Sequence, residues 1–212
     1  MAQRTLQHVS KDFRRTLVDC RSFATDANQW ALPGASPHIS RKRRDSIVEL
    51  AFLRAFLGWE TFLEDSFVLY LIGRTAPRGR APFRYFFPPN KSLAEEWMVP
   101  EDRTYAKWDV PHVCDRAERY FRDGRPFSVH LRSNQSLLDE AKTVRNAIAH
   151  ESKSAHEKFE NIVRTRLGTL PPNLTVGSFL SMTMTGTTPP LSYLEFYLGR
   201  LEVIAKKIIP GG

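Results

Sequence analysis

The stretch Leu53-Arg-Ala-Phe-Leu-Gly-Trp-Glu60-Thr-Phe-Leu-Glu64-Asp-Ser-Phe67 decides the fold of this sequence. At about 100° per residue, apolar side chains cover two sides of a helix through it. One side carries Phe52, Phe56, Trp59, Leu63 and Tyr70, and the other carries Leu53, Leu57, Phe67 and Leu71 with Glu60 and Glu64 between them. A helix that is apolar nearly all round is typical of the centre of a bundle. The stretch therefore predicts a central helix.

Helical spacing of apolar residues extends on both sides of this stretch. The central helix is predicted to run from Pro37 to Gly73, because proline favours a first helical turn and glycine the position after a helix end. Further helices are expected over about residues 4–28, 111–122, 134–150, 154–167 and 190–209. The stretch 169–190, rich in Thr, Pro and Gly, is expected to be a loop with at most a short strand over 179–184. The predicted fold class is all-α: a bundle of long antiparallel helices in a single domain over residues 1–212.

One segment breaks the helical pattern. Residues 74–110 combine prolines with arginines and aromatic residues, and the whole segment that interrupts the bundle is placed at about 74–132. This composition predicts an irregular insertion, with a short helix near 92–97, that forms a lobe separate from the helical core.

Composition narrows the functional classes. The chain has 31 Lys+Arg against 23 Asp+Glu, a net charge of +8, and this excess favours a polyanionic partner such as nucleic acid. Two cysteines, Cys20 and Cys114, exclude a disulfide framework and a cysteine-based zinc site, and both are expected in the core rather than as nucleophiles. The N-terminus carries no apolar signal region, and no apolar run approaches the roughly 20 residues of a membrane span, so a cytoplasmic protein without membrane contact is expected.

The segment from Leu137 to Glu151 carries the candidate chemistry. An apolar stripe at helical spacing consists of Leu137, Ala141, Val144 and Ile148. Asn146 and His150 form an i, i+4 pair on the opposite side of the helix, and Arg145 lies beside Asn146. A cation, an amide and an imidazole are the groups that phosphoester chemistry uses. The alternative on pattern alone is a helix C-terminus where basic side chains interact with the helix dipole.

Arg145-Asn146-Ala-Ile-Ala-His150 resembles the R-x(4–6)-H motif of the HEPN superfamily, with a polar residue directly after the arginine. The segment Glu60-Thr-Phe-Leu-Glu64 resembles the E-x-F-L-E helix of its RiboL-PSP-HEPN branch. The resemblance covers about half of the chain and does not extend to the insertion. It implies a metal-independent endoribonuclease that needs no cofactor.

The resemblance also implies roles for three residues. The 2′-hydroxyl of RNA would attack the neighbouring phosphorus and leave a 2′,3′-cyclic phosphate and a 5′-hydroxyl. His150 would move the proton and Arg145 would stabilise the phosphorane charge. Asn146 would position the side chain of either residue. The implied assembly is a homodimer with a composite site, acting on RNA as a toxin or defence effector, with a possible antitoxin protein as a further partner.

Two other functions stay open. The first is a catalytically inactive module of the same fold that binds RNA or protein. The second is a metal-dependent phosphoesterase built on His150-Glu151 and His156-Glu157, although a spacing of i, i+6 is not that of a helical metal pair. No metal ligands are therefore assigned.

Two carboxylates are assigned supporting roles. Glu60 and Glu64 interrupt an apolar stripe, and buried carboxylates need partners. Arg145 or His150 would serve, which would make Glu60 a residue that orients the motif. An ion pair with Arg54 or Arg116 is the equally weighted alternative.

Weaker signals indicate RNA contacts outside the motif. The basic run at the start of the central helix opposes the helix dipole, which hints at an anionic partner, and arginine alternates with aromatic residues in the insertion. The candidate RNA-binding residues are Arg41, Arg43, Arg44, Arg84 and Lys142. The alternatives are a solvated basic turn and a loop whose aromatic residues pack against their own domain.

Overall fold

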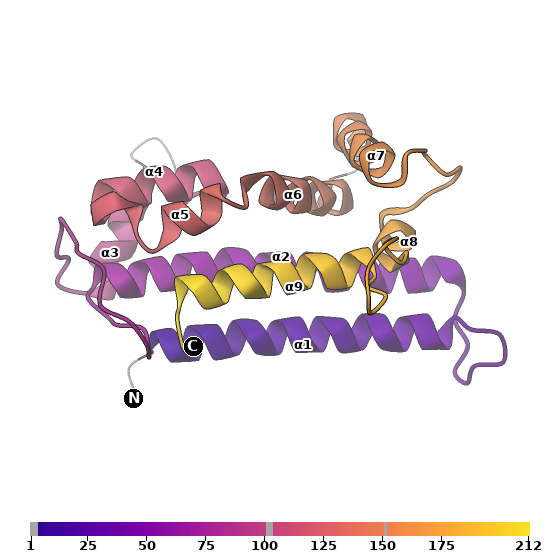
Figure 1. The fold of residues 1–212 in the computed structure, drawn as a ribbon, viewed down its shortest axis with the longest axis horizontal. Coiled ribbons are helices and arrows are strands. Elements are labelled where there is room, and N and C mark those ends of the chain that lie inside the picture. The colour runs from indigo at the N-terminus through magenta and orange to yellow at the C-terminus, as the bar shows by residue number, and fades with distance from the viewer. Residues whose placement is uncertain (1–3, 101–103, 151) are drawn as a thin grey trace. The chain divides into compact units, whose positions relative to one another are not determined.

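The computed structural model describes residues 4–100, 104–150 and 152–212. Within them the chain is helical, with no β-sheet beyond two isolated bridges, so the all-α helical bundle is confirmed. The helices are α1 (Leu6–Trp30), α2 (Arg41–Leu71), α3 (Lys91–Met98), α4 (Val110–Tyr120), a 3₁₀ turn (Arg122–Gly124), α5 (Phe127–Arg132), α6 (Gln135–Ala149), α7 (Lys153–Leu167), α8 (Val176–Ser181) and α9 (Tyr193–Ile208) (Figure 1). In the described part of the chain, none of these helices combines the length and the apolar character needed to cross a bilayer.

Two predicted boundaries were wrong for local reasons. The central helix α2 begins at Arg41 rather than Pro37, because Ser40 accepts hydrogen bonds from the N–H groups of Arg43 and Arg44 and so caps the first turn. The segment 179–184 is not a strand, because residues 179–181 lie in α8 and Thr183 forms only an isolated β-bridge with Ser192. A capping box between Thr175 and Ser178 starts this short helix.

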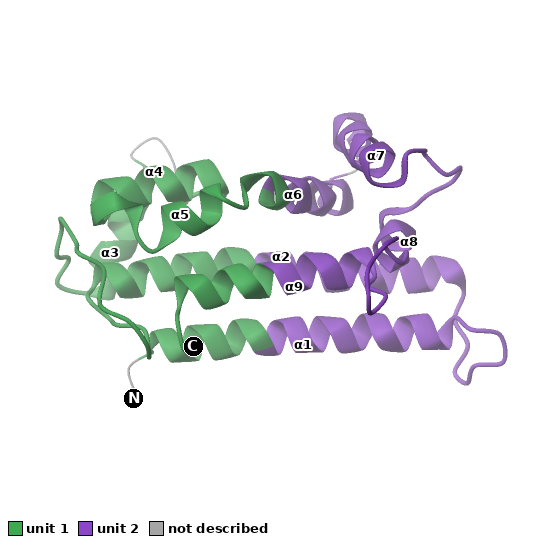
Figure 2. Ribbon diagram, in the orientation of Figure 1, with its two compact units in different colours: residues 1–14, 58–138, 201–212 green, residues 15–57, 139–200 purple. Residues whose placement is uncertain are grey.

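Contacts within the chain define two compact units (Figure 2). Unit 1 comprises residues up to 14, 58–138 and 201–212, and unit 2 comprises residues 15–57 and 139–200. The helices α1, α2, α6 and α9 contribute residues to both units. The expectation of a single domain over residues 1–212 stays a prediction.

The core of unit 1 is a cluster of aromatic rings around Phe67 of α2. Phe67 is fully buried, and its ring centroid lies 6.0 Å from that of Trp108, 5.1 Å from Phe121 and 4.9 Å from Phe127. Trp108 belongs to residues 74–110, and Phe121 and Phe127 belong to the wider insertion 74–132. Burial of the Phe121 and Phe127 rings against α2 makes them part of the core of unit 1. The expectation that residues 74–110 form a separate lobe stays a prediction.

Unit 2 has its own core, in which α8 packs against α2 and α9. The ring of Phe179 in α8 stacks on Tyr193 in α9 at 4.3 Å. The backbone N–H of Gly177 donates to Glu49 Oε1 at 2.8 Å, and a side chain at Gly177 would come within 2.2 Å of the Asp45 carbonyl oxygen. Glycine at this position allows α8 to approach α2 closely.

Candidate active site on α6

The three motif residues lie at the C-terminal end of α6, in unit 2. His150 directly follows the last helical residue, and its backbone N–H still donates to the carbonyl oxygen of Asn146 at 2.9 Å. Asn146 and His150 therefore remain one helical turn apart, as their spacing predicted. Ala141 and Val144 are buried, whereas His150 is exposed and Asn146 half-buried. The outward direction of His150 is confirmed.

Arg145 is more deeply placed than a surface residue. Its side chain is half-buried, and its guanidinium carbon lies 5.7 Å above the ring centroid of Phe56 in α2. Nη1 donates to Asn146 Oδ1 at 3.0 Å. The guanidinium is thus oriented by an aromatic ring and by the amide next to it, and an interaction of this kind is worth about 0.5–1 kcal/mol. Arg145 consequently has a structural contact besides any catalytic role.

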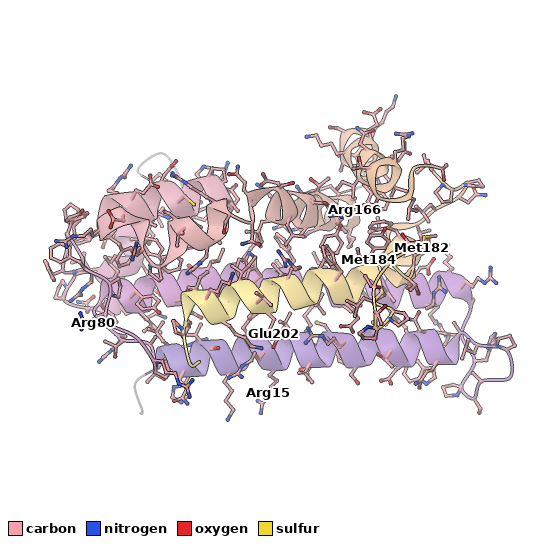
Figure 3. All side chains as sticks on the ribbon, in the orientation of Figure 1. Arg15, Arg80, Arg166, Met182, Met184 and Glu202 are labelled. Carbon is pink, nitrogen blue, oxygen red and sulfur yellow. The ribbon has the colours of Figure 1, made fainter. Side chains whose placement is uncertain are left out.

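A polar network holds α6 to its neighbours one to two turns before the motif. Glu140 accepts two hydrogen bonds of 2.8 Å from Nε and Nη2 of Arg166 in α7 and a third from the hydroxyl of Tyr197 in α9. Arg166 is one of the side chains labelled in Figure 3. The Glu140 bonds raise the pKa of Arg166, and burial together with the Glu140 charge raises the pKa of Tyr197. The network therefore keeps Arg166 charged and the Tyr197 hydroxyl protonated as a donor. No sequence pattern pointed to this network, because its three residues meet only in the folded chain.

Glu60 and Glu64 do not have the burial that their positions predicted. Glu64 is exposed and Glu60 half-buried. The pKa of Glu64 is raised, first by partial desolvation and then by the neighbouring charges of Asp65 and Glu95. Both glutamates belong to unit 1 and the motif belongs to unit 2, so their pairing with Arg145 or His150 stays a prediction.

The alternative partners proposed for these glutamates have contacts of their own, and the positive charge of Arg116 also acts on Glu64, where it counteracts the rise in pKa. Arg54 forms an ion pair with Asp19 at 3.7 Å. Arg116 donates to the Lys107 carbonyl oxygen and lies 4.5 Å above the ring centroid of Trp108.

Two of the weaker RNA-binding candidates, Arg44 and Arg84, have side-chain contacts that hold local structure. Arg44 forms an ion pair with Asp45, and Arg84 donates to the Leu71 carbonyl oxygen at 2.7 Å, which ties the following loop to the end of α2. Arg41 and Arg43 are exposed at the start of α2. Lys142 is half-buried on α6. Of the five candidates, Arg41 and Arg43 are therefore the two in the exposed class.

A pocket of about 490 Å³ adjoins α6 in unit 2. It is lined by Ala147 and Ile148 of α6, by Glu49 of α2, and by His156 of α7. Ile148 lies on the side of the helix opposite Asn146 and His150, whereas Ala147 lies one turn before His150, so the pocket adjoins the motif at the end of α6. Burial raises the pKa of Glu49.

Other candidate chemistry is weaker. Glu151, one half of a proposed His-Glu pair, lies outside the described residues. Among the residues that are described, no three His, Cys, Asp or Glu side chains gather in a way that could hold a metal ion. Cys20 and Cys114 are buried, as expected for core residues, and burial raises the pKa of the Cys20 thiol to about 11. A thiol of this kind is not a nucleophile near neutral pH.

Comparison of the chain with protein-family models, with characterised proteins and with solved structures finds no match.

Proposed function

We propose that this chain is a metal-independent endoribonuclease of the HEPN type, with Arg145, Asn146 and His150 as its catalytic residues. One observation carries the proposal: a guanidinium, an amide and an exposed imidazole gather within about one turn at the end of α6, with the guanidinium held by the amide at 3.0 Å. These groups supply positive charge and a proton carrier at the end of one helix.

The proposed reaction uses the RNA's own 2′-hydroxyl as nucleophile. Its oxygen attacks the adjacent phosphorus, the bond from phosphorus to the 5′-oxygen breaks, and the products are a 2′,3′-cyclic phosphate and a 5′-hydroxyl. One imidazole takes the proton from the 2′-hydroxyl, and another donates a proton to the leaving oxygen. Arg145 stabilises the charge that develops on the phosphorane oxygens. Asn146 keeps the guanidinium in the required orientation.

The proposed assembly follows from the need for two imidazoles, one as base and one as acid. A single imidazole cannot act as base and acid in the same step, and His150 is the only histidine of the motif. A second copy of the chain, with its own motif helix facing the first, supplies the other imidazole and a second guanidinium. The protein is therefore proposed to act as a cytoplasmic homodimer on RNA. An antitoxin protein that covers the exposed His150 would inhibit it.

The test is cleavage of labelled RNA by the purified chain in the presence of EDTA. Wild type should cut, and the new 3′ ends should resist phosphatase until acid opens the cyclic phosphate. RNA with a 2′-deoxy residue at the cut position should not be cleaved there. His150→Ala should lower the rate by about 10²–10⁴, the usual cost of losing a proton-transfer histidine.

The matched control is His156→Ala, which removes an exposed histidine from the neighbouring helix α7 of the same unit. It should cut RNA at the wild-type rate. Equal cleavage by His150→Ala and wild type would refute the assignment. Binding of RNA without cleavage would favour the inactive module, and cleavage that EDTA abolishes and His156→Ala impairs would favour the metal-dependent phosphoesterase.

A further inference from the structure

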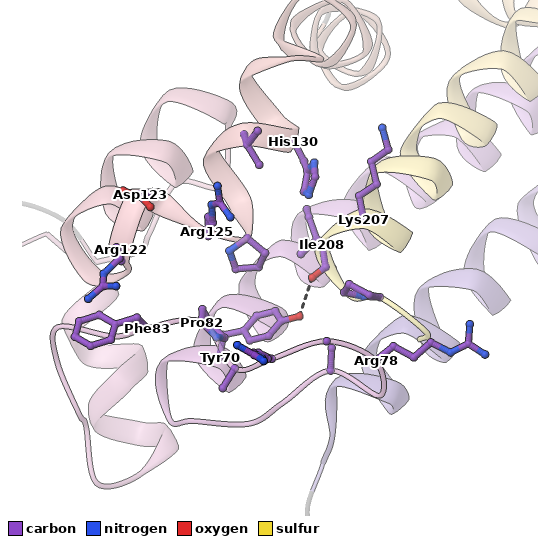
Figure 4. Close-up of a pocket in the computed structure, with 17 residues that line it drawn as sticks. Tyr70, Arg78, Pro82, Phe83, Arg122, Asp123, Arg125, His130, Lys207 and Ile208 are labelled. Carbon is purple, nitrogen blue, oxygen red and sulfur yellow. Dashed lines mark hydrogen bonds between the residues drawn. The ribbon is translucent and has the colours of Figure 1, made fainter.

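Unit 1 contains a pocket of about 730 Å³ that the proposed cleavage does not use. Its wall consists of residues 76–83 of the loop after α2, residues 122–130 around the start of α5, and the end of α9 (Figure 4). A volume in this range is that of sites for small organic ligands and cofactors.

The pocket wall is strongly basic. It holds the permanent cations Arg78, Arg80, Arg122, Arg125 and Lys207 against the single carboxylate of Asp123. Throughout residues 4–100, 104–150 and 152–212, none of these five side chains forms an ion pair with a carboxylate. Positive charge that the protein itself does not neutralise attracts an anionic ligand.

His130, a half-buried residue of the pocket wall, lies in the electric field of these cations. Burial lowers its pKa, and the charges of Lys207 and Arg125 lower it further. Figure 4 places His130 between these two cations along one rim of the pocket. The rim therefore offers two fixed charges and a neutral imidazole to a ligand's phosphate oxygens.

An aromatic platform adjoins the cations. The ring of Phe83 is 53% exposed, and the guanidinium carbon of Arg122 lies 4.2 Å from its centroid. The backbone N–H of Arg122 donates to the carbonyl oxygen of Phe83 at 3.0 Å, and that of Tyr85 donates to Tyr120 at 2.9 Å. Phe83 is thus held in place by backbone hydrogen bonds while its ring stays accessible. Exposed aromatic rings beside basic side chains are typical of surfaces on which nucleobases stack.

We propose that this pocket binds a nucleoside phosphate, with the phosphate on Arg125 and Lys207 and the base stacked at Phe83. Inorganic phosphate alone would leave the aromatic ring and the apolar wall of Pro82 and Ile208 without a partner. The same chemistry is presented by a free nucleotide and by one residue of a single-stranded RNA.

The test measures binding of two probes to the full chain by fluorescence anisotropy: a fluorescent ATP analogue, and a labelled RNA of about ten nucleotides in which every 2′-hydroxyl is methylated. The methylated strand cannot be cleaved by 2′-hydroxyl attack, so binding is measured independently of the proposed nuclease activity. The probe that binds tighter identifies the source of the nucleotide.

The chain offers matched controls for both contacts. Lys207→Ala should weaken binding about tenfold and lower the slope of log affinity against log salt concentration by about one, the value for one lost phosphate contact. Lys206→Ala, at the adjacent exposed position outside the pocket, should change neither the affinity nor the slope. Phe83→Leu should also weaken binding about tenfold but leave the salt dependence unchanged, because it removes stacking and no charge. Phe87→Leu is its control in the same loop.

Wild-type affinity for both probes in Lys207→Ala and Phe83→Leu would overturn the proposal. Competition by inorganic phosphate as effective as that by ATP would overturn it too, since the site would then recognise an anion without a base.

Discussion

Glu140→Ala should lower the free energy of unfolding by about 3 kcal/mol. The Glu140 carboxylate is 15% exposed and the Arg166 side chain 30% exposed. Removing one partner of a fully buried pair costs about 3–5 kcal/mol, but partial hydration of Arg166 reduces this to about 1–2 kcal/mol. The buried Tyr197 hydroxyl also loses its acceptor, which costs about 1–3 kcal/mol.

A double-mutant cycle with Arg166→Ala isolates the pairwise term. Urea unfolding followed by helical circular dichroism should give a coupling energy above about 1 kcal/mol between Glu140 and Arg166. The control cycle uses Glu160 and Arg164, an exposed i, i+4 pair with a 3.1 Å contact on α7, the helix that also carries Arg166. The expected coupling energy of this control pair is about 0.3–0.5 kcal/mol. A coupling at Glu140 no larger than that of the control would refute the view that this network anchors the motif helix.

Two further predictions concern the cores of the two units. Phe67→Ala should lower the free energy of unfolding by about 3–5 kcal/mol, because it empties the centre of the aromatic cluster. Phe87→Ala is the control and should lower it by less than about 1 kcal/mol, because the Phe87 ring is 66% exposed. Equal losses for the two variants in urea unfolding would contradict this prediction. Burial raises the pKa of Glu49, so the stability it contributes is present below its unfolded pKa near 4.5 and is lost as pH rises through its folded pKa. Glu49→Gln keeps an acceptor for the Gly177 N–H without a charge, and should therefore be more stable than wild type at neutral pH by a difference that disappears below about pH 4. A loss of stability at neutral pH alone would show that the charge itself is needed.

The sequence determined the helices because their signals are local. Apolar residues at helical spacing and polar caps predicted a helix over 134–150, and the structure has Gln135–Ala149; the helix predicted over 154–167 is Lys153–Leu167, ended by Gly168 in the left-handed conformation. The missed helix α8 has only six residues, too few for apolar spacing to stand out in a stretch rich in Thr, Pro and Gly.

The burial of the central helix depended on its neighbours. Its apolar residues surround the axis, so spacing alone could not decide which side the other helices cover. In the structure Phe52 and Trp59 are buried, whereas Leu57 and Glu64 are exposed. The prediction of buried glutamates was wrong because it assumed that other helices cover every apolar stripe of the central helix.

For the candidate sites, too, some features followed from the sequence alone and others only from the tertiary structure. The sequence by itself determined that Asn146 and His150 lie one turn apart at the end of one helix, with Arg145 next in the chain to Asn146, because residues four apart on a helix are neighbours in any fold. Only the tertiary structure decided that Arg145 lies over Phe56, that Glu140 meets Arg166 and Tyr197, and that cations from three distant segments line one pocket in unit 1. Such contacts join residues far apart in the chain, and they form only because burial of the apolar faces brings separate helices and loops together.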